Sequence, residues 1–460
     1  MSIRAGAPRL TRREALKQFG GGLGLAGFAA AATPITGNPW SPKAPHFAPK
    51  AKHIIVIFLQ GGLSQVDSFD AKPMLDKYDG KPLPYETPRT EFATGALMRS
   101  PFSFKKYGRS GIEVSEIFPH MAGIIDEFCI VRSMISDIPN HGPSVLMMNT
   151  GSVRVGRPSM GSWVVYGLGT ENQNLPGYIV LTAESGGGGD FGGAFLPAVY
   201  QGTLVPYTQA DPNKQIQSLA NARMNLTQQR DQLDLVRDLN QSYIDQLHGA
   251  PELEAAVQSM EVAFRMQTEA PDVFDTRKES PATLAAYGTE GIGRACVTAR
   301  RLVEKGVRFV QVVHAGWDHH TDIMGHKLTA RAVDQPIAAL VSDLKQRGLL
   351  DETLVLVTSE FGRTPVINLG GFRSVHNGRD HNIYGFTVLM AGGGAKAGAI
   401  YGSTDDFGFK VAENPVHVHD LHATALHMLG LDHTRLTYRY AGRDFRLTDV
   451  AGKVVKEIVA

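Results

Sequence analysis

The chain has 460 residues, more than one compact core usually holds, so we expect one large domain with a smaller insertion. Its 46 lysines and arginines balance 45 aspartates and glutamates, which excludes the strongly basic surface that would favour nucleic acid as a partner. The two cysteines, Cys129 and Cys296, exclude a disulfide framework, and their apolar neighbours indicate core thiols.

Residues 1–33 have the form of a twin-arginine export signal. Arg12 and Arg13 come before a run of glycine, alanine and leucine that ends in small residues. The apolar part, residues 19–32, is too short and too rich in glycine and alanine for a membrane-spanning helix. We therefore expect a periplasmic or secreted protein with a linker at 34–52 and no membrane span in the mature chain. A retained basic arm is the alternative.

Short apolar runs without alternation follow the linker, and they indicate strands that are covered on both faces. The runs occupy residues 53–59, 128–131, 178–182, 307–313, 353–358 and 386–390. Helical patterns lie between several of them, for example at 291–305 and 329–346. This order predicts an α/β fold over residues 53–460, with a doubly wound, largely parallel central sheet sandwiched by helices.

Two segments depart from this pattern. Residues 215–274 are polar-rich, with apolar residues near helical spacing, and they predict an inserted helical pair within 205–275 that breaks at 249–251. The glycine-rich loop at 186–193 lacks the Lys-Ser/Thr ending of a phosphate-binding loop. We expect this loop to be a flexible lid.

Polar residues follow the predicted strands, where open parallel sheets bind their ligands. They are Asp67, Asp70, His141, Ser144, Asp318, His320 and Glu360, with His381 shortly before the sixth apolar run. If the strands are parallel, these carboxylates and imidazoles gather at one edge of the sheet.

Carboxylate oxygen and imidazole nitrogen are the ligand set of zinc, manganese or iron, whereas calcium takes oxygen almost alone. Asp318 and His320 form a polar pair after an apolar strand, so a ligand role is favoured over a packing role. Glu360 and His381 are favoured as functional residues for similar reasons. The sequence thus predicts a catalytic site with a divalent metal, and it leaves the choice among zinc, manganese and calcium open.

Other polar residues keep two interpretations. Asp67 and Asp70 suit metal ligation and the capping of a turn equally well. The histidines between residues 417 and 427 lie in an amphipathic helical pattern, so packing or exposure to water is favoured over a metal cluster.

Arg363 and Arg379 stand next to the proposed ligands. A guanidinium presents a planar fork that matches the oxygens of phosphate or sulfate, so both are candidates for binding a substrate oxyanion. Pairing with Glu360 or Asp380 is an equal alternative.

An ordered set of motifs resembles the domain-of-unknown-function 1501 family, a secreted, sulfatase-like branch of the alkaline phosphatase superfamily. The motifs read QGGLSQVDSFDAKP, NHGPSVLMMNTG, HAGWDHHTD, TSEFGRTP, GRDHNIYGFTVLMAGGG and DLHATALHMLGLD. The resemblance implies a largely parallel sheet with a divalent metal centre at its carboxyl edge. By similarity, the metal ligands would be Asp67 or Asp70, together with Asp318, His320 and His381.

The chain also departs from that family pattern. Glu360 and Phe361 stand where better-known members have an aspartate and a histidine, so one of two metal positions is expected to be weakened or lost. His141 occupies the nucleophile position of the sulfatase motif, with no cysteine near it, which excludes formylglycine chemistry there. Ser144 or a metal-activated water could be the nucleophile, and His141 could be a ligand, a nucleophile or a general acid.

We therefore expect a metal-dependent hydrolase of sulfate or phosphate esters, whose substrate is an anionic ester such as a sulfated polysaccharide. A protein of reduced activity that binds an anionic glycan or a partner is one alternative. A phosphodiesterase or phosphomutase-type activity is another. The sequence does not indicate the oligomeric state.

Overall fold

The computed structural model describes residues 39–183, 191–209, 211, 215–216, 223–246, 251–288, 291–370 and 377–460. The predicted export signal at 1–33 and most of the predicted glycine-rich lid at 186–193 lie outside the described residues. Within the described ranges, none of the helices combines the length and the apolar character that a membrane span requires.

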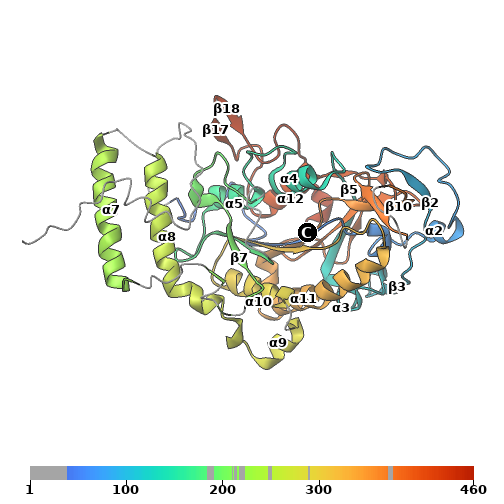
Figure 1. Cartoon of the computed structure of the whole chain (residues 1–460), viewed down its shortest axis with the longest axis horizontal. Coiled ribbons are helices and arrows are strands. Elements are labelled where there is room, and N and C mark those ends of the chain that lie inside the picture. Colours follow the sequence, from blue (N-terminus) through green and yellow to red (C-terminus); the bar gives the residue numbers. More distant parts are fainter. Residues whose placement is uncertain are drawn as a thin grey trace, which may run out of the picture.

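A nine-stranded sheet runs through the centre of the described part of the chain (Figure 1). Its strands are β1 (His53–Gln60), β5 (Phe128–Ile135), β6 (Tyr178–Thr182), β7 (Thr203–Pro206), β8 (Phe309–Ala315), β9 (Thr353–Thr358), β12 (Phe386–Ala391), β13 (Ile400–Tyr401) and β16 (Val416–His417). The order is β13-β5-β12-β9-β1-β8-β6-β7, and β16 pairs with β5. Pairing is parallel except along β12, which runs antiparallel to both β9 and β5. The predicted largely parallel α/β fold is confirmed.

Two layers of helices cover the sheet, because the central strands are apolar on both faces. Along β1, Ile55 and Ile57 pack with α3 (Pro119–Gly123), α10 (Gly291–Glu304) and α11 (His326–Gln346). Ile54 and Val56 face the other layer, which consists of α4 (His141–Thr150), α5 (Met160–Leu168) and α12 (Val418–Met428). Figure 1 shows the two layers on opposite sides of the sheet. The carboxyl ends of the parallel strands therefore open at one edge, between the layers.

A pair of long helices, α7 (Leu226–Gln246) and α8 (Pro251–Val273), stands at one end of the molecule (Figure 1). Arg230 on α7 forms an ion pair with Glu261 on α8 at 2.5 Å, and the last turns of α8 pack into the core. The expected insertion at 205–275 contains both helices, although β7 extends to Pro206 and belongs to the central sheet. The predicted break falls partly on residues 247–250, which lie outside the described residues.

A second, three-stranded antiparallel sheet in the order β11-β10-β2 was not predicted. Its strands are β2 (Thr94–Leu97), β10 (Gly362–Asn368) and β11 (Arg379–Asn382). All four residues of β11 are buried although three are charged or can become charged and the fourth is an amide, so hydrophobic periodicity cannot reveal the strand. The sheet pairs Arg363 with His381 in register, which brings two predicted site residues together.

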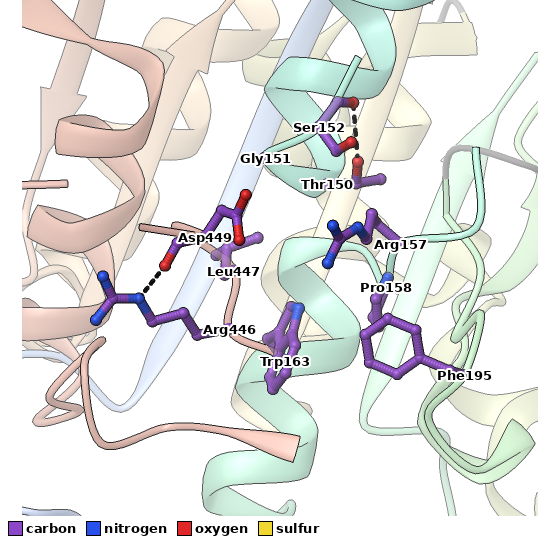
Figure 2. A pocket seen from close by; sticks show the side chains of 10 residues that line it. All are labelled: Thr150, Gly151, Ser152, Arg157, Pro158, Trp163, Phe195, Arg446, Leu447 and Asp449. Carbon is purple, nitrogen blue, oxygen red and sulfur yellow. Dashed lines mark hydrogen bonds between the residues drawn. The ribbon is translucent and has the colours of Figure 1, made fainter. Parts of the chain in front are cut away.

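Shorter elements complete the described part of the chain. They are α2 (Pro73–Lys77), α9 (Pro281–Tyr287), β3 (Phe104–Tyr107), β4 (Ile112–Ser115), β14 (Ser403–Thr404), β15 (Val411–Glu413), β17 (Tyr438–Tyr440) and β18 (Arg443–Phe445). The segment after the β17–β18 hairpin lines a small hollow beside α4 and α5 (Figure 2).

Candidate metal centre

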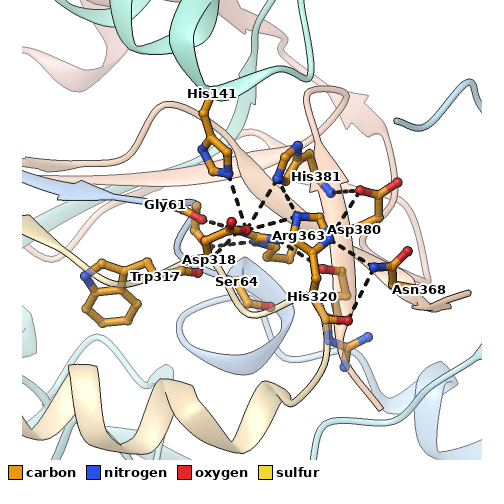
Figure 3. Close-up of polar contacts among 12 residues, drawn as sticks. Gly61, Ser64, His141, Trp317, Asp318, His320, Arg363, Asn368, Asp380 and His381 are labelled. Carbon is orange, nitrogen blue, oxygen red and sulfur yellow. Dashed lines mark hydrogen bonds and ion pairs between the residues drawn. The ribbon is translucent and has the colours of Figure 1, made fainter. Parts of the chain in front are cut away.

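Four side chains from three segments of the chain converge beyond the carboxyl end of β8 (Figure 3). Asp318 and His320 lie in the loop after β8, His381 lies in β11, and His141 is the first residue of α4. One potential ligand atom from each side chain lies within 4.8 Å of all the others. The cluster is therefore compact enough for one cation to contact all four side chains.

The carboxylate of Asp318 is at the centre of this cluster. Its Oδ1 lies 3.0 Å from His320 Nε2, 3.3 Å from His141 Nε2 and 3.5 Å from His381 Nε2. The Asp318 side chain is 46% exposed, whereas His320 and His381 are buried. A ligand from solvent can therefore reach the cluster along the Asp318 side.

The ring nitrogens of the cluster have the arrangement expected of metal ligands. The Nε2 atoms of His320 and His381 face each other at 2.8 Å, so they either share a proton or direct both lone pairs at one cation. His141 Nε2 is buried, and its one close polar neighbour among the described residues is Asp318 Oδ1, at 3.3 Å and without good hydrogen-bond geometry. A buried nitrogen of this kind is costly unless something binds it, so the residues present fit a divalent cation.

Each imidazole also has a partner for its second nitrogen. His141 Nδ1 donates to Glu360 Oε1 at 2.7 Å. His381 Nδ1 contacts the carbonyl of Pro139 and lies 3.0 Å from Glu91 Oε2. Asn368 Nδ2 lies 3.0 Å from His320 Nδ1. Such outer contacts fix the ring orientation of metal-binding histidines, and here they turn Nε2 of His141 and His381 towards Asp318.

The turn after β1 brings the backbone unusually close to the cluster. Gly61 has a φ of 121°, and a Cβ atom built on it would lie 2.6 Å from Asp318 N. Its own N–H donates to both carboxylate oxygens of Glu360, at 2.8 and 3.1 Å. Only glycine accommodates both the backbone conformation and the close approach, so this residue sets the distance between β1 and the loop after β8.

The electrostatics of the cluster keep Asp318 ionised. Burial alone would raise the pKa of the Asp318 carboxyl. Hydrogen bonds from the three histidines and the charge of Arg363 outweigh burial and hold this pKa far below its usual value. For His141, burial lowers the pKa, but the carboxylates of Asp318 and Glu360 outweigh burial and raise it to about 9. In the absence of a cation, a proton on His141 therefore balances part of this negative charge.

Arg363 and Arg379 bind groups of the protein itself, and their carboxylate partners are Asp318 and Asp67 instead of the expected Glu360 and Asp380. Both side chains are fully buried. Arg363 binds Asp318 Oδ1 at 2.6 Å and the carbonyl oxygens of Gly61, Gly62 and Arg379. Arg379 holds Asp67 through two hydrogen bonds of 2.7 and 3.1 Å. With their donors used inside the protein, both arginines position the backbone and carboxylates around the cluster.

Asp67 and Asp70 lie outside the cluster. The Asp67 carboxylate is occupied by Arg379 and by Ser64 Oγ at 2.5 Å. Asp70 lies 3.1 Å from Lys72 Nζ and 3.7 Å from Arg132 Nε, and it accepts a hydrogen bond from a threonine hydroxyl. These aspartates neutralise buried cations, which is a structural role close to the capping interpretation and distinct from metal ligation.

Two further predicted site residues also lie apart from the four. Ser144 is buried in α4, and its hydroxyl donates to the carbonyl of Ile138, so it does not reach the cluster. Glu360 is fully buried and touches the cluster only through Nδ1 of His141. Phe361 packs its ring 4.9 Å from that of His141 and 4.4 Å from that of His381. Glu360 and Phe361 therefore orient imidazoles instead of contributing ligand atoms.

Sequence reasoning missed several residues of the site. Glu91, Asn368 and the Gly61 amide act only as outer partners. Glu91 comes from an irregular segment before β2, and nothing in its local sequence marks it. The glycine pair at 61–62, directly after a buried strand, was the one available signal of a close backbone approach.

The late histidines form hydrogen bonds, in line with the favoured interpretation. His419 Nε2 and His422 Nε2 each lie 2.8 Å from a carbonyl oxygen, of Gly151 and Met148 respectively. Both carbonyls are at the end of α4, so the two rings hold that helix end against α12.

Comparisons with known proteins give one family match. The family model described as "Protein of unknown function (DUF1501)" matches residues 51–459. No curated protein sequence matches the chain significantly. Because the function of this family is unknown, the match does not identify a reaction.

Similar solved structures include three hydrolases. The PsFucS1 sulfatase from Pseudoalteromonas sp. is 13% identical, with 83% of this chain and 68% of that chain covered and a TM-score of 0.36. The phosphonate monoester hydrolase SpPMH from Silicibacter pomeroyi is 13% identical, with 74% and 71% covered and a TM-score of 0.31. Alkaline phosphatase from the Antarctic bacterium TAB5 is 12% identical, with 78% and 96% covered and a TM-score of 0.29. Likeness of this low degree implies nothing about substrate or mechanism.

The Gly61→Ala substitution should destabilise the protein more than Gly80→Ala. Both glycines have a positive φ, so alanine is strained at either position, by about 1–2 kcal/mol. At Gly80 a Cβ would meet nothing within 4 Å, whereas at Gly61 it would overlap the backbone of Trp317 and Asp318. Urea unfolding followed by circular dichroism should therefore show a clearly larger loss of unfolding free energy for Gly61→Ala. Equal losses would contradict the close approach.

Proposed function

The chain belongs to the DUF1501 family of proteins of unknown function, and from the geometry of its His–Asp cluster we propose that it is a metal-dependent hydrolase of sulfate or phosphate esters. One observation carries the proposal: the ligand atoms of Asp318, His141, His320 and His381 lie within 4.8 Å of one another, with one side of the cluster open to solvent. Three imidazoles and one carboxylate suit zinc, manganese or iron better than calcium, which prefers oxygen ligands.

A divalent cation supplies positive charge to an ester oxyanion and lowers the pKa of a water nucleophile. The residues of the chain supply the rest. Asp318, His320 and His381 would hold the cation, and Arg363, itself anchored to four backbone carbonyls, fixes Asp318 by an ion pair. His141 reaches the cluster from the start of α4, and Glu360 holds its ring.

His141 has two possible roles with different consequences. Catalytic metal sites usually keep three protein ligands and one open position, whereas structural sites use four protein ligands. If His141 is not a ligand, its Nε2 is available to take or give a proton beside the open position. If it is the fourth ligand, the coordination is closed, which favours the second candidate function: binding of an anionic glycan or partner without turnover.

Replacing Asp318 and His320 together by alanine should remove bound metal and ester hydrolysis while leaving the fold intact. The double variant deletes the central carboxylate and one facing imidazole. Elemental analysis of the purified full chain should show close to one divalent metal per wild-type molecule and almost none in the variant. Turnover of aryl sulfates and aryl phosphates, assayed with each metal added, should be lost in parallel.

The matched control replaces another Asp–His pair, Asp137 and His417, which lie 3.1 Å apart and are not among the four residues of the cluster. This control should keep its metal and its activity. Full metal content in the Asp318→Ala/His320→Ala protein would reject the site. Metal loss without any hydrolysis by the wild type, across sulfate, phosphate and phosphonate esters, would favour the binding function.

A second pair of variants separates the roles of His141 and Glu360. His141→Asn should leave the metal content unchanged and abolish turnover if the position beside the cation is open. Glu360→Gln should lower metal affinity or turnover roughly 10- to 100-fold, the usual cost of losing a carboxylate behind a metal-site histidine. The readouts are metal titration and kcat. Loss of metal in His141→Asn would instead identify a four-ligand, closed site.

Export by the twin-arginine route is the proposed localisation, and it is supported by Arg12 and Arg13 before an apolar run. This route would deliver a folded protein to the periplasm. Changing both arginines to lysine should leave the full-length protein in the cytoplasmic fraction, whereas changing Arg4 and Arg9 should not. Cell fractionation and the mass of the mature chain test this, and unchanged export of the Arg12→Lys/Arg13→Lys protein would refute it.

A further inference from the structure

An irregular segment directly before β2, residues 89–93, lies against the metal cluster, and we call it the 89–93 strap. The three-stranded sheet holds this strap at two points. Leu369 N, directly after β10, donates to the carbonyl of Ala93 at 2.8 Å. Phe92 N donates to the Asp380 carboxylate in β11 at 2.8 Å. The position of the strap is therefore set by the sheet that carries two residues of the site.

The aromatic side chain of the strap packs on one imidazole of the cluster. The rings of Phe92 and His320 meet edge to face, with centroids 5.3 Å apart and an angle of 87° between their planes. The backbone of Gly370 approaches the other side of this residue, since a Cβ atom built on Gly370 would lie 2.6 Å from Phe92 Cβ. Phe92 thus restricts the rotation of the His320 ring and is itself confined.

The acidic side chain of the strap, Glu91, uses both of its carboxylate oxygens. Its Oε2 lies 3.0 Å from His381 Nδ1, and its Oε1 accepts a hydrogen bond from Asn140 Nδ2 at 3.2 Å. The Glu91 side chain is only 24% exposed. A glutamate of this length gives up rotational freedom to stay in one position, and here two donors on different elements offset that cost.

The contact with Glu91 determines which nitrogen of His381 carries the proton. Nδ1 of His381 faces the Glu91 carboxylate and the carbonyl of Pro139, and both of these groups are acceptors. The ring proton therefore belongs on Nδ1, which leaves the lone pair of Nε2 directed towards Asp318 (Figure 3). A carboxylate behind a metal-binding imidazole also raises the basicity of the nitrogen that binds the metal.

Asn140 connects the same carboxylate to the start of α4. It is the N-cap residue of this helix, where an asparagine side chain usually accepts a hydrogen bond from the first turn. The Asn140 side chain makes no such cap and donates to Glu91 instead. The next residue is His141, whose ring lies 4.3 Å from that of His381 between centroids. Glu91 is therefore in contact with two elements that each carry one histidine of the cluster.

We infer that Glu91 is a positioning residue of the metal centre, which holds His381 directly and holds the start of α4 through Asn140. This double contact raises the affinity of the cluster for a divalent cation, because imidazoles on two elements are in place before the cation binds. The inference rests on the metal binding that the proposed function requires, and it does not depend on turnover.

The test measures the affinity of the metal-free full chain for Zn²⁺, by competition with a chromophoric chelator. Glu91→Gln keeps the size of the side chain and removes its charge, so Zn²⁺ should bind roughly 10- to 100-fold more weakly. Asn140→Ala removes only the contact with α4 and should cause a smaller loss. The matched control is Glu86→Gln, at an exposed glutamate five positions earlier in the same segment, and its affinity should equal that of the wild type.

Thermal unfolding separates positioning from general structural support. Without metal, Glu91→Gln should unfold at nearly the same temperature as the wild type, because the backbone contacts of the strap remain. In a fixed concentration of Zn²⁺ it should gain less stability than the wild type, since a ligand stabilises a protein in proportion to the logarithm of its affinity. A purely structural role would give the opposite pattern, with a less stable metal-free protein and an unchanged affinity.

The outcomes for Glu91 and for the hydrolase are distinguishable. Wild-type Zn²⁺ affinity in Glu91→Gln overturns this inference, even if the wild type shows metal-dependent turnover. Weaker binding in Glu91→Gln supports it, even if the wild type hydrolyses none of the esters and the proposed reaction is rejected. A wild type that binds no divalent metal overturns both.

Discussion

The ion pair between Arg363 and Asp318 is the constraint on which the rest of the site depends. A fully buried guanidinium is tolerated only when its charge and its donors are satisfied, and here one carboxylate and four backbone carbonyls do this. The same pairing holds Asp318 Oδ1 within 3.5 Å of three imidazole nitrogens. The carboxylate therefore cannot turn away to solvent without leaving a buried cation unpaired, which preorganises the cluster before any metal binds.

The backbone around this pair has little freedom. The Gly61–Gly62 turn offers its carbonyls to Arg363 and its first amide to Glu360, and Glu360 in turn holds His141. Four elements, β1, β8, β9 and α4, are thus connected through polar contacts at the carboxyl edge of the parallel strands. Because the central sheet is apolar on both faces, this edge is where buried polar groups can meet without interrupting the core.

The large sheet could be predicted from the sequence, because strands that are covered on both faces appear as uninterrupted runs of apolar residues. It also indicated Asp318, His320 and His381, since polar residues after such runs lie at the binding edge. The structural roles of Asp67 and Asp70 could not be predicted in the same way. A buried carboxylate can pair with a basic side chain or bind a metal, and the tertiary structure decides which. Asp67 pairs with Arg379, which is 312 positions away in the sequence. The polar strand β11 carries no hydrophobic period at all.

Helix α4 is held in place at both of its ends. At its first residue, His141 faces the cluster, and at its last turn the carbonyls of Met148 and Gly151 are held by His422 and His419. Burial lowers the pKa of His422 to about 3, so this ring stays neutral and binds the helix end by hydrogen bonding rather than by charge. A helix fixed at both ends keeps His141 in a constant position relative to Glu360 and Asp318, so the sheet edge and the helix layer act together on the cluster.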